Sequence, residues 1–91
     1  MAELARRVRI TGRVQGVGFR AWAAHRAEDL GISGWIRNEE DGSVSALIAG
    51  QAADVGRMIG ELRSGPRMAL VARVEEAPGE APEQSGFAVL R

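Results

Sequence analysis

Apolar and polar residues alternate near the start of the chain. Residues 7–11 read Arg-Val-Arg-Ile-Thr, a period of two that predicts a half-buried strand with Val8 and Ile10 facing the core. Helical spacing follows, with apolar residues at Phe19, Trp22, Ala23, Ala27 and Leu30. Because Gly31 suits the C-terminal cap of such a helix, the pattern predicts a strand and then a helix of about three turns.

Two apolar segments flank an acidic turn in the middle of the chain. Residues 35–36 and 44–48 are largely apolar, and residues 38–43 between them are polar. The polar segment contains Asp41-Gly42, a pair that strongly favours a tight turn. This pattern predicts a β-hairpin.

A second helix is predicted by apolar residues spaced i, i+3, i+4 and i+7, namely Val55, Met58, Ile59 and Leu62. It is expected to begin near residues 52–54 and to end at Ser64-Gly65-Pro66. Gly56 and Gly60 lie inside it, and each weakens a helix by about 1 kcal/mol relative to alanine. We interpret this glycine pair as a place where the helix packs closely on a sheet.

The remaining segments complete an α+β pattern. Residues 68–74 are expected to form a strand, residues 78–85 a polar loop, and residues 87–90 a short closing strand. The order strand, helix, strand, strand, helix, strand, with a final edge strand, is the split βαβ, ferredoxin-like arrangement. We therefore expect residues 1–91 to form a single domain with two helices on one face of a mixed or antiparallel sheet.

Composition excludes several classes of chemistry. The 91 residues contain no cysteine and no lysine, so disulfides, thiolate nucleophiles, Schiff bases and the P-loop lysine are all excluded. No segment resembles a signal peptide or approaches the length of a membrane span. We expect a cytoplasmic protein without membrane association.

Charge is distributed unevenly although the net charge is zero. Residues 1–37 carry seven arginines and three acidic residues, whereas residues 38–91 carry five arginines and nine acidic residues. This excess can draw a small anion toward one end of the domain, although alternately charged solvated faces explain it equally well. The overall balance argues against nucleic-acid binding, which favours a strongly basic domain.

The segment from Gly12 to Arg20 reads Gly-Arg-Val-Gln-Gly-Val-Gly-Phe-Arg and leads from a strand directly into a helix. Glycines let successive backbone N–H groups point into one concavity, and the helix adds its free N–H groups and the positive end of its dipole. The segment lacks the third glycine of a dinucleotide fingerprint and the Gly-Lys-Ser/Thr of a P-loop. It predicts a phosphate-binding loop of another type, the alternative being a tight turn without a ligand.

Arg20 strengthens the phosphate interpretation. It falls in the first turn of the predicted helix, where a cation opposes the helix dipole. A guanidinium beside free N–H groups can bind phosphate through two parallel hydrogen bonds. The alternative for a lone arginine is a solvated surface charge.

Other polar and aromatic residues are assigned to structure. His25 is the single histidine of a chain without cysteine, so we do not expect it to act as a base or a metal ligand. Residues 39–41 are consecutive acids in a turn, which are not expected to converge on a metal. Trp22 and Trp35 fall at apolar positions, and we expect both to pack in the core.

Two segments of the chain resemble the signature segments of the acylphosphatases. They are the run from Gly12 to Arg20 and the run Gly34-Trp35-Ile36-Arg37-Asn38 with Asp41-Gly42-Ser43-Val44. The resemblance continues more loosely through the second predicted helix, so it covers essentially the whole chain. It implies a ferredoxin-like enzyme that hydrolyses the carboxyl-phosphate bond of acyl phosphates without a metal or cofactor.

The resemblance also implies roles for individual residues. Arg20 would bind the phosphoryl group and Asn38 would orient the attacking water, whereas without the first motif Asn38 reads as a turn former. The backbone N–H groups expected to cradle the phosphate belong to Gln15, Gly16, Val17, Gly18, Phe19 and Arg20. Inorganic phosphate or sulfate would then compete with the substrate, and a monomer is the expected state.

Three other interpretations are weighed against this one. RNA recognition domains share the layer arrangement but display aromatics on two central strands, and this chain has no aromatic residue in its first predicted strand. A similar loop occurs in the acylphosphatase-like domain of hydrogenase maturation carbamoyltransferases, where it typically continues Gly-Phe-Arg-Pro-Phe rather than Phe19-Arg20-Ala21-Trp22. A regulatory role that retains the site also stays open.

Overall fold

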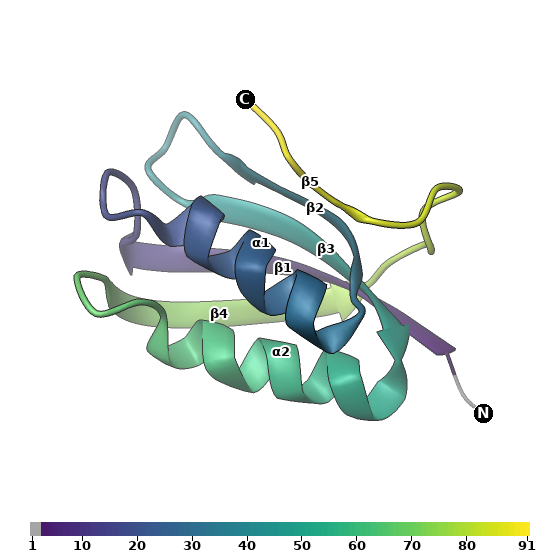
Figure 1. The fold of residues 1–91 in the computed structure, drawn as a ribbon. Helices are drawn as coiled ribbons and strands as arrows, with labels where there is room; N and C mark the ends of the chain where they lie inside the picture. The colour runs from purple at the N-terminus through teal and green to yellow at the C-terminus, as the bar shows by residue number, and fades with distance from the viewer. Residues whose placement is uncertain (1–2) are drawn as a thin grey trace.

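A computed structural model describes residues 3–91, which form one five-stranded sheet with two helices on one face (Figure 1). The elements are β1 (Glu3–Arg13), α1 (Phe19–Leu30), β2 (Ser33–Asn38), β3 (Val44–Gln51), α2 (Ala52–Ser64), β4 (Leu70–Pro78) and β5 (Phe87–Val89). The predicted element order and layer arrangement are confirmed. Residues 1–2 of the expected domain lie outside the described part of the chain.

The sheet is mixed, with strand order β4-β1-β3-β2-β5. β1 lies between β3 and β4 and is antiparallel to both, and β2 is antiparallel to β3. Only the pairing of β2 with the short edge strand β5 is parallel. The central strands therefore come from the earlier part of the chain, and the two edges from its C-terminal part.

The core lies between the helices and one face of the sheet. Val8 and Ile10 are buried there as predicted, because alternate residues of β1 point toward the helices. The largest side chains that are fully buried with them are Phe19, Ile36, Ile48, Met58 and Leu62. Burial of each such side chain contributes about 1.5–3 kcal/mol, which makes this layer the main source of stability.

The second helix follows its predicted apolar stripe. Val55, Met58, Ile59 and Leu62 are its buried residues. The interpretation of Gly56 and Gly60 is wrong, however, because both face solvent and a Cβ added at either would meet no atom within 4 Å. They are spaced one turn apart on the side of the helix that points away from the sheet.

The strand boundaries differ from the predicted ones where the chain forms the edge of the sheet. β4 begins and ends later than expected, because its pairing with β1 extends to Pro78, which faces Arg6. Met68 precedes the strand and is 67% exposed. β5 ends at Val89, although the N–H of Leu90 still donates to the Ile36 carbonyl over 2.8 Å.

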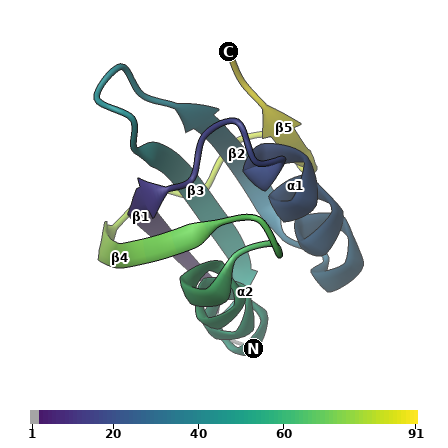
Figure 2. The same ribbon diagram turned by 90° about the vertical axis from the view of Figure 1, so that its left-hand side faces the viewer.

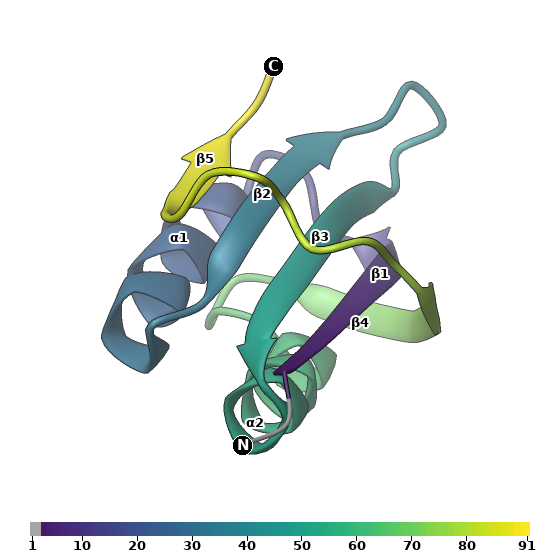
Figure 3. The same cartoon turned by 90° about the vertical axis from the view of Figure 1, so that its right-hand side faces the viewer.

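The two tryptophans occupy different environments. Trp22 is partly buried against the core, with its ring 5.5 Å from that of Phe19 in an edge-to-face arrangement. The core prediction for Trp35 is wrong, because Ile36 faces the helices and the strand period places Trp35 on the opposite face. There Trp35 pairs with Leu47. The chain between β4 and β5 crosses this face of the sheet (Figure 3).

Candidate active site

The loop between β1 and α1 lies at one end of the sheet, beside the turn between β2 and β3 (Figures 1 and 2). Just before this loop, the pairing of β1 with β4 shifts register between Thr11 and Gly12. Val14 and Phe19, on either side of the loop, are 1% and 2% exposed. The loop is therefore anchored in the core at both ends, which holds residues 15–18 in a defined position.

The backbone of the loop is shaped to present N–H groups. Gly16 and Gly18 have φ angles of 73° and 77°, a left-handed conformation that glycine adopts without a steric penalty. A Cβ at either position would meet no atom within 4 Å, so the space beside them is open. Left-handed residues of this kind turn successive N–H groups toward one concave side, which is a common arrangement for binding anions.

The start of α1 adds further donors to the same region. Gly18 is its N-cap residue, no side chain caps the helix, and its first turn has no acidic residue. The N–H groups of the first turn have no partner within the helix, and the helix dipole is positive at this end. An anion placed here would satisfy both the free donors and the dipole.

A hollow of about 280 Å³ opens between the loop, the end of β2 and the end of β5. The residues that line it are Val14, Gly16, Gly18, Phe19, Arg20, Ala21, Asn38 and Val89. Most of the predicted site residues thus meet, although Asn38 is far from the loop in sequence. The predicted Gln15 and Val17 do not line this hollow.

A larger hollow of about 540 Å³ lies along α1 toward its C-terminal end. It is lined mainly by small and apolar residues, together with His25 and Glu28. No arginine and no helix N-terminus faces it. The smaller hollow is therefore the candidate site, because it brings together a cation, free N–H groups and an amide, which the larger hollow does not.

Arg20 is held by the C-terminal end of the chain. Its Nη1 donates to the Leu90 carbonyl over 2.8 Å. Within residues 3–91 Arg20 takes part in no ion pair. Its positive charge, which opposes the dipole of α1, is therefore left available to an anion in the hollow.

Asn38 is the last residue of β2, and its side chain carries an unusual feature. Within the described residues its Oδ1 is buried and has no hydrogen-bond partner. A buried acceptor without a partner costs about 1–3 kcal/mol, so such groups mark places where a water or a ligand completes the site. Asn38 is thus suited to accept a hydrogen bond from a molecule in the hollow.

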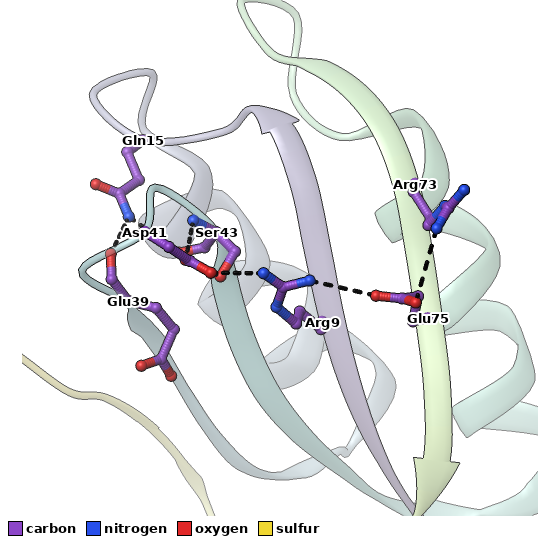
Figure 4. A network of polar contacts seen from close by, with 7 residues as sticks. All are labelled: Arg9, Gln15, Glu39, Asp41, Ser43, Arg73 and Glu75. Carbon is purple, nitrogen blue, oxygen red and sulfur yellow. Dashed lines mark hydrogen bonds and ion pairs between the residues drawn. The ribbon is translucent and has the colours of Figure 1, made fainter.

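Gln15 makes a connection that sequence analysis missed. Its Nε2 donates to the Glu39 carbonyl over 2.8 Å and to the Ser43 carbonyl over 2.9 Å, as Figure 4 shows for Glu39. These bonds link the loop to the turn that follows Asn38. The only signal in the sequence was a polar residue of suitable length just before Gly16, which does not identify its partners.

The acidic turn is held by its own aspartate (Figure 4). Asp41 Oδ1 accepts from the Ser43 hydroxyl over 2.6 Å and from the Ser43 N–H over 2.9 Å, and Arg9 donates to its other oxygen. The Ser43 hydroxyl and N–H, then Arg9, hold the pKa of Asp41 well below its usual range. Asp41 therefore stays ionised at neutral pH and braces the turn.

Glu39 points to a different partner. Its carboxylate accepts from Arg37 over 2.8 Å, and this hydrogen bond is the largest cause of the lowered pKa of Glu39.

Among residues 3–91, no three histidine, aspartate or glutamate side chains gather where they could hold a metal ion. In the same residues, neither helix has the length and apolar character that a bilayer span requires.

Comparison with known proteins gives a consistent result. A family model described as acylphosphatase matches residues 6–89. A Rhizobium etli protein called acylphosphatase is 61% identical over 69 residues, which are 76% of this chain and 73% of that protein. One of the same name from Rhizobium meliloti is 54% identical over 87 residues, covering 92% of this chain and 90% of the relative.

A solved structure extends the agreement to three dimensions. The structure of an acylphosphatase from Coxiella burnetii superimposes with a TM-score of 0.92 at 31% sequence identity. The match covers 97% of this chain and 93% of the other. The backbone arrangement that brings the loop beside the end of β2 is therefore shared with a protein of that name.

Proposed function

The chain belongs to the acylphosphatase family and is a hydrolase acting on acyl phosphates, and from this premise we propose how its own residues carry out the reaction. The loop of residues 15–20 cradles the phosphoryl group with backbone N–H groups, Arg20 binds the phosphoryl oxygens, and Asn38 orients the attacking water. The reaction requires no metal ion or cofactor. The observation that carries the proposal is the meeting of Gly16, Gly18, Arg20 and Asn38 around one hollow.

The phosphate cradle rests on geometry and charge. The left-handed glycines and the uncapped start of α1 supply N–H donors, and Arg20 supplies a cation without a carboxylate partner in the described residues. Donors that are fixed before the substrate arrives stabilise the charge that develops on the phosphoryl oxygens in the transition state. Inorganic phosphate and sulfate present similar oxygens and should compete for the same place.

The water is positioned by Asn38. Its buried Oδ1 can accept a hydrogen bond from a water molecule, and an asparagine does not titrate in the physiological range. The water oxygen attacks phosphorus, the bond from phosphorus to the acyl oxygen breaks, and the carboxylate leaves with the electron pair. The water's proton passes to a phosphoryl oxygen of the substrate, so no protein base is needed, and His25 does not line the hollow.

Selectivity is expected to lie at the phosphoryl end of the substrate. Arg20 and Asn38 are the lining residues with polar side chains, and the other side chains that line the hollow are apolar, namely Val14, Phe19, Ala21 and Val89. Such a site holds the phosphate firmly and tolerates different acyl groups. We therefore expect hydrolysis of aliphatic and aromatic acyl phosphates at comparable rates.

The decisive experiment measures hydrolysis of benzoyl phosphate by the purified protein in the presence of a chelator. We expect turnover that inorganic phosphate inhibits competitively. Asn38→Ala should lower kcat by at least roughly 10²-fold, because a preorganised group at the attacking water is lost. Near-normal turnover by folded Asn38→Ala would contradict the role of this residue, and loss of wild-type activity with the chelator would contradict metal independence.

A matched control lies in the same turn. Glu40 is exposed and follows shortly after Asn38, so Glu40→Ala tests whether any change near the turn impairs the enzyme. Glu40→Ala should retain wild-type kcat and KM. A loss as large as that of Asn38→Ala would show that the turn as a whole, rather than the Asn38 amide, determines the rate.

A further inference from the structure

The side chain of Gln15 is placed between the two halves of the site. It is half-buried, and its amide nitrogen contacts two carbonyl oxygens, those of Glu39 and Ser43. Because a carbonyl can only accept, the NH2 group and not the amide oxygen must face them. Both hydrogens of the NH2 group are therefore used, one for each carbonyl.

These two carbonyls lie at the two ends of the turn between β2 and β3. Glu39 directly follows Asn38, and its N–H donates to the same Ser43 carbonyl over 2.8 Å. Gln15 thus bonds to both ends of a turn whose ends are already joined by the hydrogen bond from Glu39 to Ser43. In residues 3–91, no other side chain makes a hydrogen bond between this turn and the loop of residues 15–18.

We propose that the Gln15 side chain is a positioning residue that sets the distance and angle between the phosphate-binding loop and the Asn38 amide. The proposal rests on the proposed function, because it gives Gln15 a part in the same hydrolysis. It differs from the predicted role of the Gln15 backbone N–H, which lies on the main chain and is retained in any side-chain variant.

Positioning matters here because Asn38 has little else to hold it. Its Oδ1 has no partner in the described residues, so the side chain depends on the backbone at the end of β2 for its place. A displacement of about 1 Å between reacting groups can lower a rate by roughly 10²-fold. The phosphoryl group is fixed by the loop, and the water by Asn38, so a link between loop and turn controls their alignment.

The other contacts of the turn do not reach the loop. Arg9 pairs with Asp41 and with Glu75 on β4, which ties the turn to the sheet beneath it (Figure 4). These pairs are exposed, and exposed pairs hold geometry weakly. They do not involve the loop of residues 15–18, so among the side-chain hydrogen bonds of residues 3–91 only those of Gln15 join the two segments.

The first test replaces Gln15 by methionine, which has similar length and no donor. We expect Gln15→Met to lower kcat for benzoyl phosphate by about tenfold or more, because Asn38 loses its alignment. The inhibition constant of inorganic phosphate should change by less than about twofold, because the cradle and Arg20 remain. An unchanged kcat, or an equal loss of phosphate affinity, would overturn the positioning role.

Gln84→Met is the matched control, since Gln84 is exposed in the chain between β4 and β5 and does not line the hollow. It should leave both constants unchanged. Thermal unfolding of each variant shows whether it is folded at the assay temperature. Absence of hydrolysis by wild type would overturn the proposed function and this inference together, whereas an active wild type with an equally active Gln15→Met overturns only the inference.

A double-mutant cycle then asks whether Gln15 acts through Asn38. If it does, Gln15→Met should cost less than about twofold in kcat when Asn38 is already alanine, because there is no amide left to align. Equal losses in both backgrounds would show that Gln15 acts independently of Asn38 and would overturn the proposal.

Gln15→Glu gives a measurement that does not depend on the methionine variant folding. The introduced carboxylate, when ionised, cannot donate to either carbonyl, whereas the protonated acid can donate one hydrogen bond. The ratio of the kcat of Gln15→Glu to that of wild type should therefore rise at least about threefold as the pH falls from about 7 to about 5. A ratio that stays constant over this range would overturn the proposal.

Discussion

The two helices lie side by side on the same face of the sheet, yet they begin in opposite ways. α2 has Asp54 in its first turn and Arg63 in its last, which is the arrangement that the helix dipole favours. α1 has no acidic residue in its first turn and carries Arg20 there instead. Neither helix has a side-chain cap at its start, but the N-cap backbone also differs: it is left-handed at Gly18 of α1 and extended at Gln51 of α2.

This contrast separates a helix that mainly stabilises the fold, α2, from a helix that also lines the candidate site, α1. α2 buries a stripe of large apolar residues and follows the local rules, whereas α1 buries one large residue, Phe19, with two alanines. Under the proposed function, a bound anion would supply the negative charge that the first turn of α1 lacks. Local rules are commonly broken at functional sites, and α1 breaks them at its first turn.

The largest expected effect comes from removing the cation of α1. Arg20→Ala should lower kcat/KM for benzoyl phosphate by at least roughly 10²-fold and weaken inhibition by phosphate, because the positive charge that binds the phosphoryl oxygens is lost. Stability should fall by no more than about 1 kcal/mol, because the lost bond to Leu90 is offset by relief of the unfavourable dipole contact.

Arg20→Lys sharpens this test, since it keeps the charge and loses the planar fork. Its kcat/KM should lie between those of wild type and Arg20→Ala. Steady-state kinetics and urea unfolding in phosphate-free buffer measure both quantities. If Arg20→Ala unfolds the protein, or leaves kcat/KM within about threefold of wild type, the assignment of α1 to chemistry rather than stability is wrong.

An intermediate effect is expected at the two ends of α1. Gly18 and Gly31 both have left-handed backbones, with φ of 77° and 67°, and both have open space where a Cβ would lie. Alanine at either position should cost about 1 kcal/mol of stability from backbone strain. Only Gly18→Ala should also lower kcat, by about tenfold, because its N–H lies in the phosphate-binding loop.

Because both alanine variants introduce the same kind of backbone strain, comparing them separates the effect of strain from the effect on the loop. Urea unfolding gives the stability of each, and the same preparations are assayed for turnover. Equal kinetic losses in Gly18→Ala and Gly31→Ala would show that the activity follows the stability of α1 and not the shape of its start.

The smallest effect is expected in α2. Gly56→Ala and Gly60→Ala should each raise the free energy of unfolding by about 1 kcal/mol, because both residues are helical, exposed and free of contacts at Cβ. Turnover should not change, since neither residue lines the hollow. Destabilisation by either variant, measured by thermal unfolding, would restore the predicted packing role of this glycine pair.

Periodicity predicted most of the fold. α1 ends at Leu30 before Gly31, and α2 spans residues 52–64, both as expected from apolar spacing and end signals. The errors concern which side chains face the core and which face away from it. Trp35 was expected in the core, but the strand period assigns only one of Trp35 and Ile36 to the helices, and the apolar character of both concealed which one.

The candidate site was predictable where its residues form continuous segments. Gly16, Gly18, Arg20 and Asn38 were identified through their motifs, and all four line one hollow. The link from Gln15 to the turn was not predictable, because its acceptors are backbone carbonyls, which every residue possesses. The same holds for the Leu90 carbonyl that receives Arg20.

The sequence by itself determined the elements, their order and the glycine-rich character of the loop, because these depend on residues close together in the chain. Tertiary structure decided the contacts that complete the site. Gln15 reaches Glu39 across 24 positions and Arg20 reaches Leu90 across 70. Such contacts depend on which strands pair and in which register, and hydrogen bonds to main-chain carbonyls leave no mark in the identity of the residues that provide them.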